Sequence, residues 1–395
     1  MTSFQQGLGH KPNTVNSSEF QTAKILALSV SHFIHDVYSS FLAPLLPMLI
    51  EKLSLSFTQA GLLSTVMQLP ALMNPYIGLL ADRVSVRYFV ILAPMMTAIP
   101  MSLIGLAPSY GVLLLLLFAA GVSVALFHVP SPVMIARLAG SKKGRGMSFY
   151  MTGGELARAV GPLIVVGAVT LWGLEGFYPI MVVGIIASGW LYWRLRDVKL
   201  MSRNHKKKTK VKSAWLRTRH ILIPLTGILT ARGFMHASLT AFLPTYVQME
   251  SGNLWLAGAA LTLFESAGVA GVLTAGSLSD YFGRRKMLLI SLICAPFGLL
   301  LFVFSGNHIR VAALLFTGFT LLSTTPVMLA LVQEHAGDSP AAANGLFMMI
   351  SFLARSAVVV IVGMIGDGIG LQAAYIISAV TGFFGIPFIL MLPRE

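Results

Sequence analysis

The segment GLLADRVSVR at residues 78–87 recurs as GSLSDYFGRR at residues 276–285, and this repeat establishes the architecture. From residue 78 to residue 276 the offset is 198, about half of the 395-residue chain. Ordered matches half a chain apart indicate two copies of one structural unit. Three further pairs keep nearly the same offset: FIHDVYSSFL at 33 with FMHASLTAFL at 234, PVMIA at 132 with PVMLA at 326, and LARAV at 156 with LARSA at 353.

Both copies consist mainly of apolar segments of about 20 residues, the length that an α-helix needs to cross a bilayer. Of all residues, 56% are hydrophobic and 11% are charged, whereas soluble domains carry about 25% charged residues. The sequence therefore predicts an all-α membrane protein with twelve transmembrane helices in two pseudo-symmetric six-helix halves. The predicted helices span residues 24–50, 59–81, 88–107, 111–137, 147–171 and 176–196, then 219–247, 255–278, 286–305, 309–333, 343–366 and 371–392.

The distribution of basic residues predicts the topology. A formal charge of +14 is also typical of nucleic-acid-binding proteins, but here twenty Lys and Arg residues fall on one set of loops and two, Lys52 and Arg310, on the other. This asymmetry follows the positive-inside rule and predicts that both termini are cytoplasmic. Because six spans separate the copies, the halves should be related by an axis along the membrane normal, with the solute path between them. No nucleic-acid partner is expected.

The same pattern divides the chain into four parts. Residues 1–23 are polar, lack the features of a secretory signal, and are predicted to form a cytoplasmic N-terminal tail. Residues 24–198 form the first half, 199–218 a basic cytoplasmic linker suited to an anionic lipid surface, and 219–395 the second half. The lone Cys294 excludes an internal disulfide.

Ten ionisable residues fall inside the predicted membrane spans. Each costs roughly 2.5 to 3.5 kcal/mol on insertion scales, so such residues mark solute pathways or proton relays. The third, sixth, ninth and twelfth predicted helices have none at this depth, which predicts that these four face lipid while the other eight line a path. The ten residues are His32, His35, Asp36, His128, Glu155, Arg158, Arg232, His236, Glu265 and Arg355.

Two arginines occupy equivalent places in the two copies. Arg158 and Arg355 lie in the repeated LARAV and LARSA segments, and two guanidinium groups facing one path suit an anionic head group, because their geometry matches carboxylate or phosphate. Glu155 shares a helix face with Arg158. The pair either neutralises itself or takes part in binding, and both interpretations stay open.

The acidic residues are candidates for proton coupling. Asp36 lies about halfway along the first predicted helix, where a desolvated carboxylate can take up and release a proton near neutral pH. Glu265 and Glu155 are further candidates, and Asp36 is favoured because of its depth and its neighbour His35. The alternative is that a nearby arginine holds each carboxylate charged. Arg232 either joins the anion site or pairs with Asp36 or Glu265.

The histidines permit a metal interpretation. His32 and Asp36 stand one helical turn apart with His35 adjacent, and His128 or His236 would complete a set of ligands. No CxxC, HExxH or His-rich loop strengthens this interpretation. Hydrogen-bonded polar histidines are favoured instead, and neither a metal nor another cofactor is expected.

The repeated loop resembles the signature of the major facilitator superfamily, and the resemblance implies the major facilitator fold. The copy that ends in GRRK at 283–286 is nearer the full pattern than the first, where Ser85 replaces the usual second glycine. The resemblance further implies a conformational latch at the cytoplasmic ends of the halves. Its candidate residues are Gly78, Asp82, Arg83, Arg87, Asp280, Arg284 and Arg285.

A second resemblance, covering most of the chain, is to the fosmidomycin-resistance family of efflux proteins. It rests on SVSHFIHDVYSSFLAPLLPML at 29–49, the following LSFTQAGLL, and GVSVALFHVPSPVMIARLAG at 121–140. The glycine and proline pattern of the fifth helix also fits. The resemblance implies proton-driven export of small molecules from a bacterial cytoplasm. Because Glu155 and Arg158 replace residues expected to be uncharged in the family, fosmidomycin itself is not inferred as the substrate.

These observations predict a proton-coupled exporter of a small anionic or amphiphilic compound that works by alternating access. The alternatives are an organic-anion importer or exchanger without proton coupling, a transition-metal exporter, and a non-transporting sensor. No catalytic constellation indicates an enzyme. The expected partners are a small-molecule substrate, protons and membrane lipid, and the expected state is a monomer in a bacterial inner membrane. The candidate substrate-binding residues are Arg158, Arg355, Glu155, His128, His236, Arg232, Tyr38 and Phe127.

Overall fold

The computed structural model describes residues 20–74, 77, 87–140, 143–196, 211–336 and 340–393. Within these ranges all regular structure is helical and there is no strand, as predicted. Nine of the described helical segments are long and apolar enough to cross a membrane. The other three predicted spans, at 59–81, 176–196 and 219–247, coincide with shorter or more polar helices where they are described, and residues 75–76 and 78–81 lie outside the described residues.

The first half contains six predicted spans, several of which are divided into two helices. Its elements are α1 (Thr22–Ser39), α2 (Leu42–Leu53), α3 (Phe57–Gln68), η1 (Leu69–Met73), α5 (Arg87–Leu103), η2 (Ile104–Leu106), α6 (Tyr110–His128), α7 (Ser131–Leu138), α8 (Lys143–Gly176), η3 (Tyr178–Ile180) and α9 (Met181–Leu195). Helix α3 begins with a capping box in which Ser56 and Gln59 satisfy each other's backbone N–H groups.

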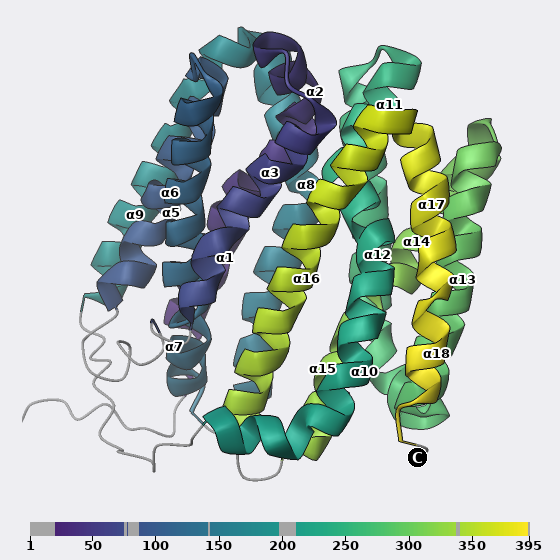
Figure 1. The fold of residues 1–395 in the computed structure, drawn as a ribbon. Helices are drawn as coiled ribbons and strands as arrows, with labels where there is room; N and C mark the ends of the chain where they lie inside the picture. Colours follow the sequence, from purple (N-terminus) through teal and green to yellow (C-terminus); the bar gives the residue numbers. More distant parts are fainter. Residues whose placement is uncertain are drawn as a thin grey trace, which may run out of the picture.

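The second half repeats this plan (Figure 1). Its elements are α10 (Val211–Ala237), the π-helical η4 (Ser238–Phe242), α11 (Leu243–Ser251), α12 (Leu254–Phe282), α13 (Arg284–Phe304), α14 (Asn307–Leu322), α15 (Thr324–His335), α16 (Pro340–Ile369), α17 (Leu371–Phe383) and α18 (Gly385–Leu390). Because α10 begins at Val211, the last part of the predicted linker is helical, and the predicted division of the chain into a tail, two halves and a linker stays a prediction.

Prolines explain why several predicted spans are broken. Proline has no N–H to donate to the carbonyl four residues earlier, and Pro132 and Pro326 are equivalent residues of the two copies. Accordingly α6 ends at His128 and α14 ends at Leu322, each four residues before its proline. The duplication therefore extends to the breaks inside the helices, and one of these breaks places His128 at a helix terminus.

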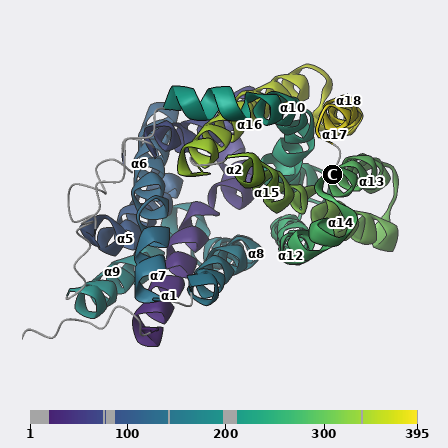
Figure 2. The ribbon, with the colours of Figure 1, turned by 90° about the horizontal axis from the view of Figure 1, so that it is seen from below.

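The two halves lie side by side and meet at the end of the bundle opposite the described chain ends (Figures 1 and 2). Helix α3 packs against α16, α8 against α12, and α2 against α11. Gly61 lets α3 approach closely, because a Cβ there would lie 2.8 Å from the Val359 carbonyl oxygen, and one at Gly363 would lie 2.4 Å from that of Phe57. The first turn of α3 is also bonded to Asp367 of α16.

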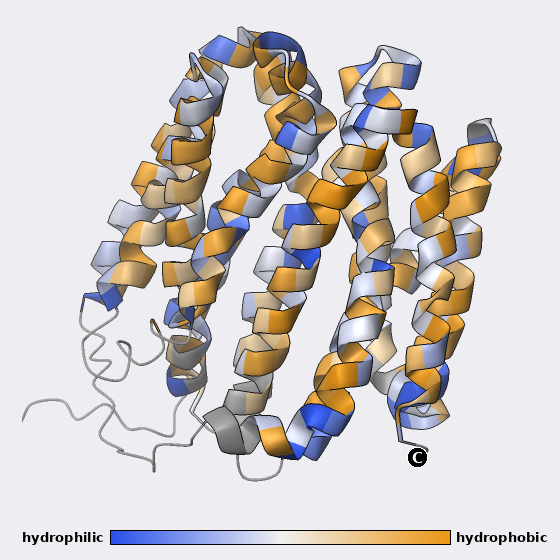
Figure 3. Cartoon of the chain, in the orientation of Figure 1, coloured by the Kyte–Doolittle hydropathy of each residue, from blue (hydrophilic) through white to orange (hydrophobic). Residues whose placement is uncertain are grey.

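The outer helices expose apolar side chains, as the sequence predicted for spans that face lipid. Ile186 of α9 and Phe304 of α13 are 64% and 69% exposed, and Figure 3 shows mainly hydrophobic colouring along the outer helices. By contrast, α8, α12 and α16, which pack between the halves, carry Glu155, Arg158, Glu265 and Arg355. The other ionisable residues lie on α1, α6 and α10.

Candidate functional site

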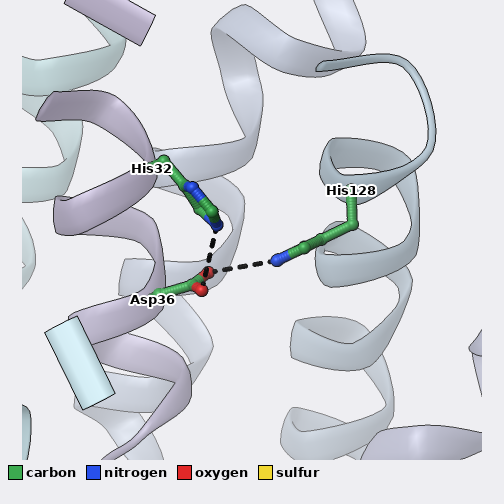
Figure 4. A group of neighbouring side chains, drawn as sticks. All are labelled: His32, Asp36 and His128. Carbon is green, nitrogen blue, oxygen red and sulfur yellow. Dashed lines mark ion pairs between the residues drawn. The ribbon is translucent and has the colours of Figure 1, made fainter. Parts of the chain in front are cut away.

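Asp36 lies at the centre of a cluster of imidazoles in the first half. Its carboxylate oxygens are 3.1 Å from Nε2 of His32, 2.8 Å from Nδ1 of His35 and 3.4 Å from Nε2 of His128. Figure 4 shows His32 and His128 pointing at the carboxylate from two sides, one from α1 and the other from α6. Among the residues that the structure describes, Asp36 pairs only with imidazoles, and no guanidinium group forms an ion pair with it. Asp36 is therefore surrounded by histidines and not paired with an arginine, as the alternative interpretation had it.

Backbone carbonyls determine which imidazole nitrogens carry hydrogen. Nδ1 of His32 lies 2.8 Å from the carbonyl oxygen of Tyr150, and Nδ1 of His128 lies 3.1 Å from that of Val124. A carbonyl oxygen only accepts hydrogen bonds, so each Nδ1 donates, and a neutral ring then has a lone pair on Nε2. Both lone pairs face the Asp36 carboxylate, which is itself an acceptor.

Aromatic packing holds this cluster in place. Tyr150 stacks on His32 with ring centroids 4.0 Å apart, and Phe127 stacks on His35 at 4.4 Å. The Tyr150 hydroxyl lies 2.5 Å from Oγ of Ser131. Neither Tyr150 nor Ser131 was identified from the sequence, because neither is charged and their contact links α8 to α7. The repeated PVM segment beside Ser131 and the family-like segment 121–140 drew attention to this region, but not to these two hydroxyl groups.

The two predicted aromatic contacts of the substrate lie inside the first half. Phe127 is fully buried against the imidazoles. Tyr38 is also buried, and its hydroxyl donates a hydrogen bond to the Ile180 carbonyl oxygen over 2.5 Å. Their roles in solute binding stay predictions, and their position is that of packed core residues.

Arg158 is shared between acidic residues of both halves. It forms an ion pair with Glu155 one turn earlier on α8, and its Nε lies 3.9 Å from Oε2 of Glu265 on α12. The Arg158 side chain is 47% exposed, whereas those of Glu155 and Glu265 are 13% and 11% exposed. The guanidinium group therefore borders a solvent-accessible space between the halves, and the sequence did not indicate that Glu265 would approach it.

The second half supplies two cations that form no ion pair with a carboxylate in the described structure. Buried Arg232 donates to the Leu321 carbonyl oxygen at 3.2 Å, and its Nε has no hydrogen-bond partner. Arg355 lies 5.8 Å from the Phe352 ring and interacts electrostatically with Arg158, Arg232 and Glu265. Arg232 forms no ion pair with Asp36 or Glu265 in the described structure, and its place in an anion site stays a prediction. His236 lies in the same region and contacts Thr240.

The predicted latch is described only in part. Gly78, Asp82 and Arg83 lie outside the described residues. Among the others, Arg284 pairs with Asp280 at 2.5 Å and with Glu334 of α15 at 2.9 Å. Arg87 bonds to the Arg196 carbonyl oxygen, and Arg285 to that of Leu392 at 3.4 Å. These contacts hold helices together within each half, and the latch function stays a prediction.

Comparison with known proteins identifies the family. The model of the Major Facilitator Superfamily matches residues 28–261 and 253–395, which is nearly the whole chain. The chain belongs to the major facilitator superfamily. This membership implies twelve spans, which agrees with the twelve predicted segments. It also makes the protein a multi-pass membrane transporter of a small-molecule substrate and not an enzyme.

Two curated relatives match over nearly their full lengths. The fosmidomycin resistance protein of Escherichia coli (strain K12) is 26% identical over 369 residues, covering 91% of this chain and 90% of the relative. The uncharacterized MFS-type transporter YfnC of Bacillus subtilis (strain 168) is 26% identical over 384 residues, covering 94% and 93%. The likeness to the fosmidomycin-resistance family that the first helix predicted is thereby confirmed.

Solved structures support the same fold. A bacterial homolog of the human lysosomal transporter Spinster, crystallised in an inward-facing and occupied conformation, superposes with a TM-score of 0.83 at 14% identity, over 95% of this chain and 97% of that one. The transporter FucP in its outward conformation gives 0.66 at 15% identity, over 95% and 100%. These identities are low, so the likeness extends to the fold.

Proposed function

We propose that this transporter exports a small anionic or amphiphilic compound from a bacterial cytoplasm in exchange for protons. The observation that carries the proposal is Arg158, which stands between Glu155 of its own half and Glu265 of the other half. A solute anion and the Glu265 carboxylate compete for this one guanidinium group. Solute binding is therefore linked to the charge on Glu265, and a carboxylate can change its charge only by taking up or releasing a proton.

The substrate class follows from the surplus of cations around this pair. Arg355 interacts electrostatically with both Arg158 and Arg232, and Glu155 and Glu265 offset two of these three charges. A guanidinium fork matches carboxylate, phosphate or phosphonate. A monoanionic head group would neutralise the remaining charge, and the apolar helix faces nearby suit an organic body. The assignments of Asp36 and His35 to proton coupling stay predictions.

Export and the bacterial inner membrane are supported by the curated relative that is named for resistance to fosmidomycin. An inhibitor is resisted when it is removed from the cytoplasm, so this relative favours the outward direction. Anion exchange without protons is the second candidate, and it is favoured by Arg232 and Arg355, neither of which forms an ion pair with a carboxylate within the described chain. We propose that the protein works as a monomer, because the proposed solute path between the two halves needs only one chain.

Reconstitution in liposomes with an internal pH dye tests the proposal. A panel of anionic, neutral and cationic compounds, phosphonates included, is added outside without a pH gradient. Exchange for protons requires the interior to become more alkaline as an anionic compound enters, because protons leave. Acidification, or tracer uptake without any pH change, would contradict proton exchange, and the latter result would favour anion exchange.

A further inference from the structure

We propose that His32, Asp36 and His128 form a binding site for a divalent transition-metal ion of the zinc type. One atom from each of these side chains can serve as a ligand, and these three atoms all lie within 4.8 Å of one another. The site joins α1 to α6 within the first half (Figure 4). It does not depend on the proposed exchange for protons.

The spacing of the ligand atoms fits a tetrahedral ion. Bonds of about 2.0–2.1 Å to nitrogen and oxygen place the ligand atoms of such an ion roughly 3.3 Å apart. Oδ2 of Asp36 lies 3.1 Å from Nε2 of His32, Oδ1 of Asp36 lies 3.4 Å from Nε2 of His128, and the three ligand atoms all lie within 4.8 Å of one another. Side-chain movements of about 1 Å would therefore bring one carboxylate oxygen and both Nε2 atoms to the spacing of a tetrahedral ion.

Each ligand is held by a second hydrogen bond that leaves its coordinating atom free. The backbone carbonyls of Tyr150 and Val124 accept from Nδ1 of His32 and His128, so both Nε2 lone pairs point inward. Nδ1 of His35 lies 2.8 Å from the Asp36 carboxylate and donates to it. Metal-binding histidines and carboxylates in proteins are oriented by contacts of this kind.

Electrostatics requires a positive species at this place. Two imidazole lone pairs and a carboxylate repel one another at these distances unless a cation or a proton lies between them. The His32 and Asp36 side chains are 5% and 11% exposed, so bulk water contributes little screening. Two neutral imidazole nitrogens and one carboxylate oxygen form the donor set that suits Zn²⁺ and Co²⁺.

The site leaves a fourth position open and one ligand accessible. Three protein ligands with an open position are typical of zinc sites that exchange a water or another ligand. The His128 side chain is 39% exposed, whereas the other two ligands are buried. The ion can therefore enter and leave past His128, so we infer an exchangeable ion rather than a permanently enclosed structural one.

Titration of Co²⁺ into the untagged, chelator-treated protein in detergent tests the site. We expect the visible absorption of tetrahedral Co²⁺ to appear, to saturate at one equivalent, and to disappear when Zn²⁺ is added. His128→Gln should weaken binding more than 100-fold and His35→Ala about 10- to 100-fold, the range seen when such supporting contacts are lost. Size-exclusion profiles and melting temperatures establish that these variants are folded.

His335→Gln is the matched control. His335 of α15 also faces another histidine, His220, with ring centroids 5.6 Å apart, but it lies in the other half. Its variant should bind Co²⁺ like the wild type. Absence of the tetrahedral spectrum in the wild type, or equal affinity in His128→Gln, would show that protons alone occupy the cluster. Loss of binding in His335→Gln would assign the ion to that second pair. Either result would overturn the proposal without touching transport.

Discussion

At the scale of single residues, the charged groups between the halves differ in how they are compensated. Arg158 pairs with Glu155 and approaches Glu265, whereas Arg355 forms no ion pair among the described residues and only interacts with Glu265 over a longer distance. An uncompensated guanidinium group at membrane depth costs free energy unless a solute or a neighbour satisfies it. The two arginines should therefore contribute differently to transport, although they are equivalent in the repeat.

Arg355→Ala should weaken the transport of anionic solutes while cationic solutes change little. Loss of a hydrogen bond to a charged group costs about 1.5–3 kcal/mol, so the KM for an anion should rise roughly 10- to 100-fold in liposome uptake. Arg355→Lys should be intermediate, because it keeps the charge but loses the fork geometry. Arg310→Gln serves as control, since Arg310 pairs with Glu250 away from the site. Equal losses for anions and cations would rule out an anion site.

Glu265→Gln should separate solute movement from proton movement. The amide keeps the shape of the side chain but cannot take up a proton, so Arg158 loses one of its two charged partners. In liposomes we expect solute exchange to continue while the solute-dependent pH change disappears. The control variant is Glu250→Gln, which replaces an acid of α11 that pairs with Arg310 and not with Arg158, and it should keep the pH change. A normal pH change in Glu265→Gln would remove this residue from the coupling mechanism.

At the scale of elements, α3 and α16 form a contact between the halves that must break when the other side opens. Asp367 near the end of α16 accepts hydrogen bonds from the backbone N–H groups of Phe57 at 2.6 Å and Thr58 at 2.8 Å, and from the Thr58 hydroxyl at 2.5 Å. A carboxylate at a helix N-terminus is favoured by the unpaired N–H groups and the helix dipole. This contact stabilises the state in which the halves meet at this end.

Asp367→Asn should shift the protein toward the state opened at this end. The loss is about 1 kcal/mol for an exposed charge at a helix terminus, which corresponds to roughly a fivefold change in population. Spin labels at Glu51 of α2 and Met249 of α11, both exposed, would report a larger long-distance fraction by pulsed electron resonance. Both labelled cysteines are introduced into a Cys294→Ser variant, so that the native cysteine is not labelled. An unchanged distance distribution would mean that Asp367 only caps α3.

At the scale of the whole molecule, the two halves repeat their spans, their proline breaks and their charge pattern. They differ where function requires it, since Asp36 of the first half corresponds to Ala237 in the second. The imidazole cluster is thus confined to one half. The residues of the proposed anion site come from both halves. Alternating access would therefore open this site to either side of the membrane in turn, while the imidazole cluster inside the first half stays intact.

The positive-inside asymmetry predicts which end of the bundle faces the cytoplasm. In a Cys294→Ser background, Asn253→Cys lies between α11 and α12, and Trp215→Cys lies near the start of α10. In intact cells a membrane-impermeant maleimide should label the first and not the second, and both should react after permeabilisation. The reverse pattern would place both termini outside and would invert the proposed direction of transport.

Much of the fold follows from local pattern, because a bilayer requires long apolar helices and the repeat shows itself in residues such as Pro132 and Pro326. The helix breaks were missed, since hydropathy continues across a proline even where hydrogen bonding stops. The ten ionisable residues named from the sequence include every charged residue of the candidate site. Their partners were not predictable, because side chains that are far apart in the sequence meet only when helices cross.

The sequence by itself determined the duplication, the twelve spans and the set of buried charges, all of which depend on composition and order along the chain. Only the tertiary structure decided that Glu265 shares Arg158 and that His32 and His128 converge on Asp36. The reason is physical. Which nitrogen of an imidazole carries a proton depends on the carbonyl beside it, and the carbonyl of Tyr150 reaches His32 only through the packing of α8 against α1.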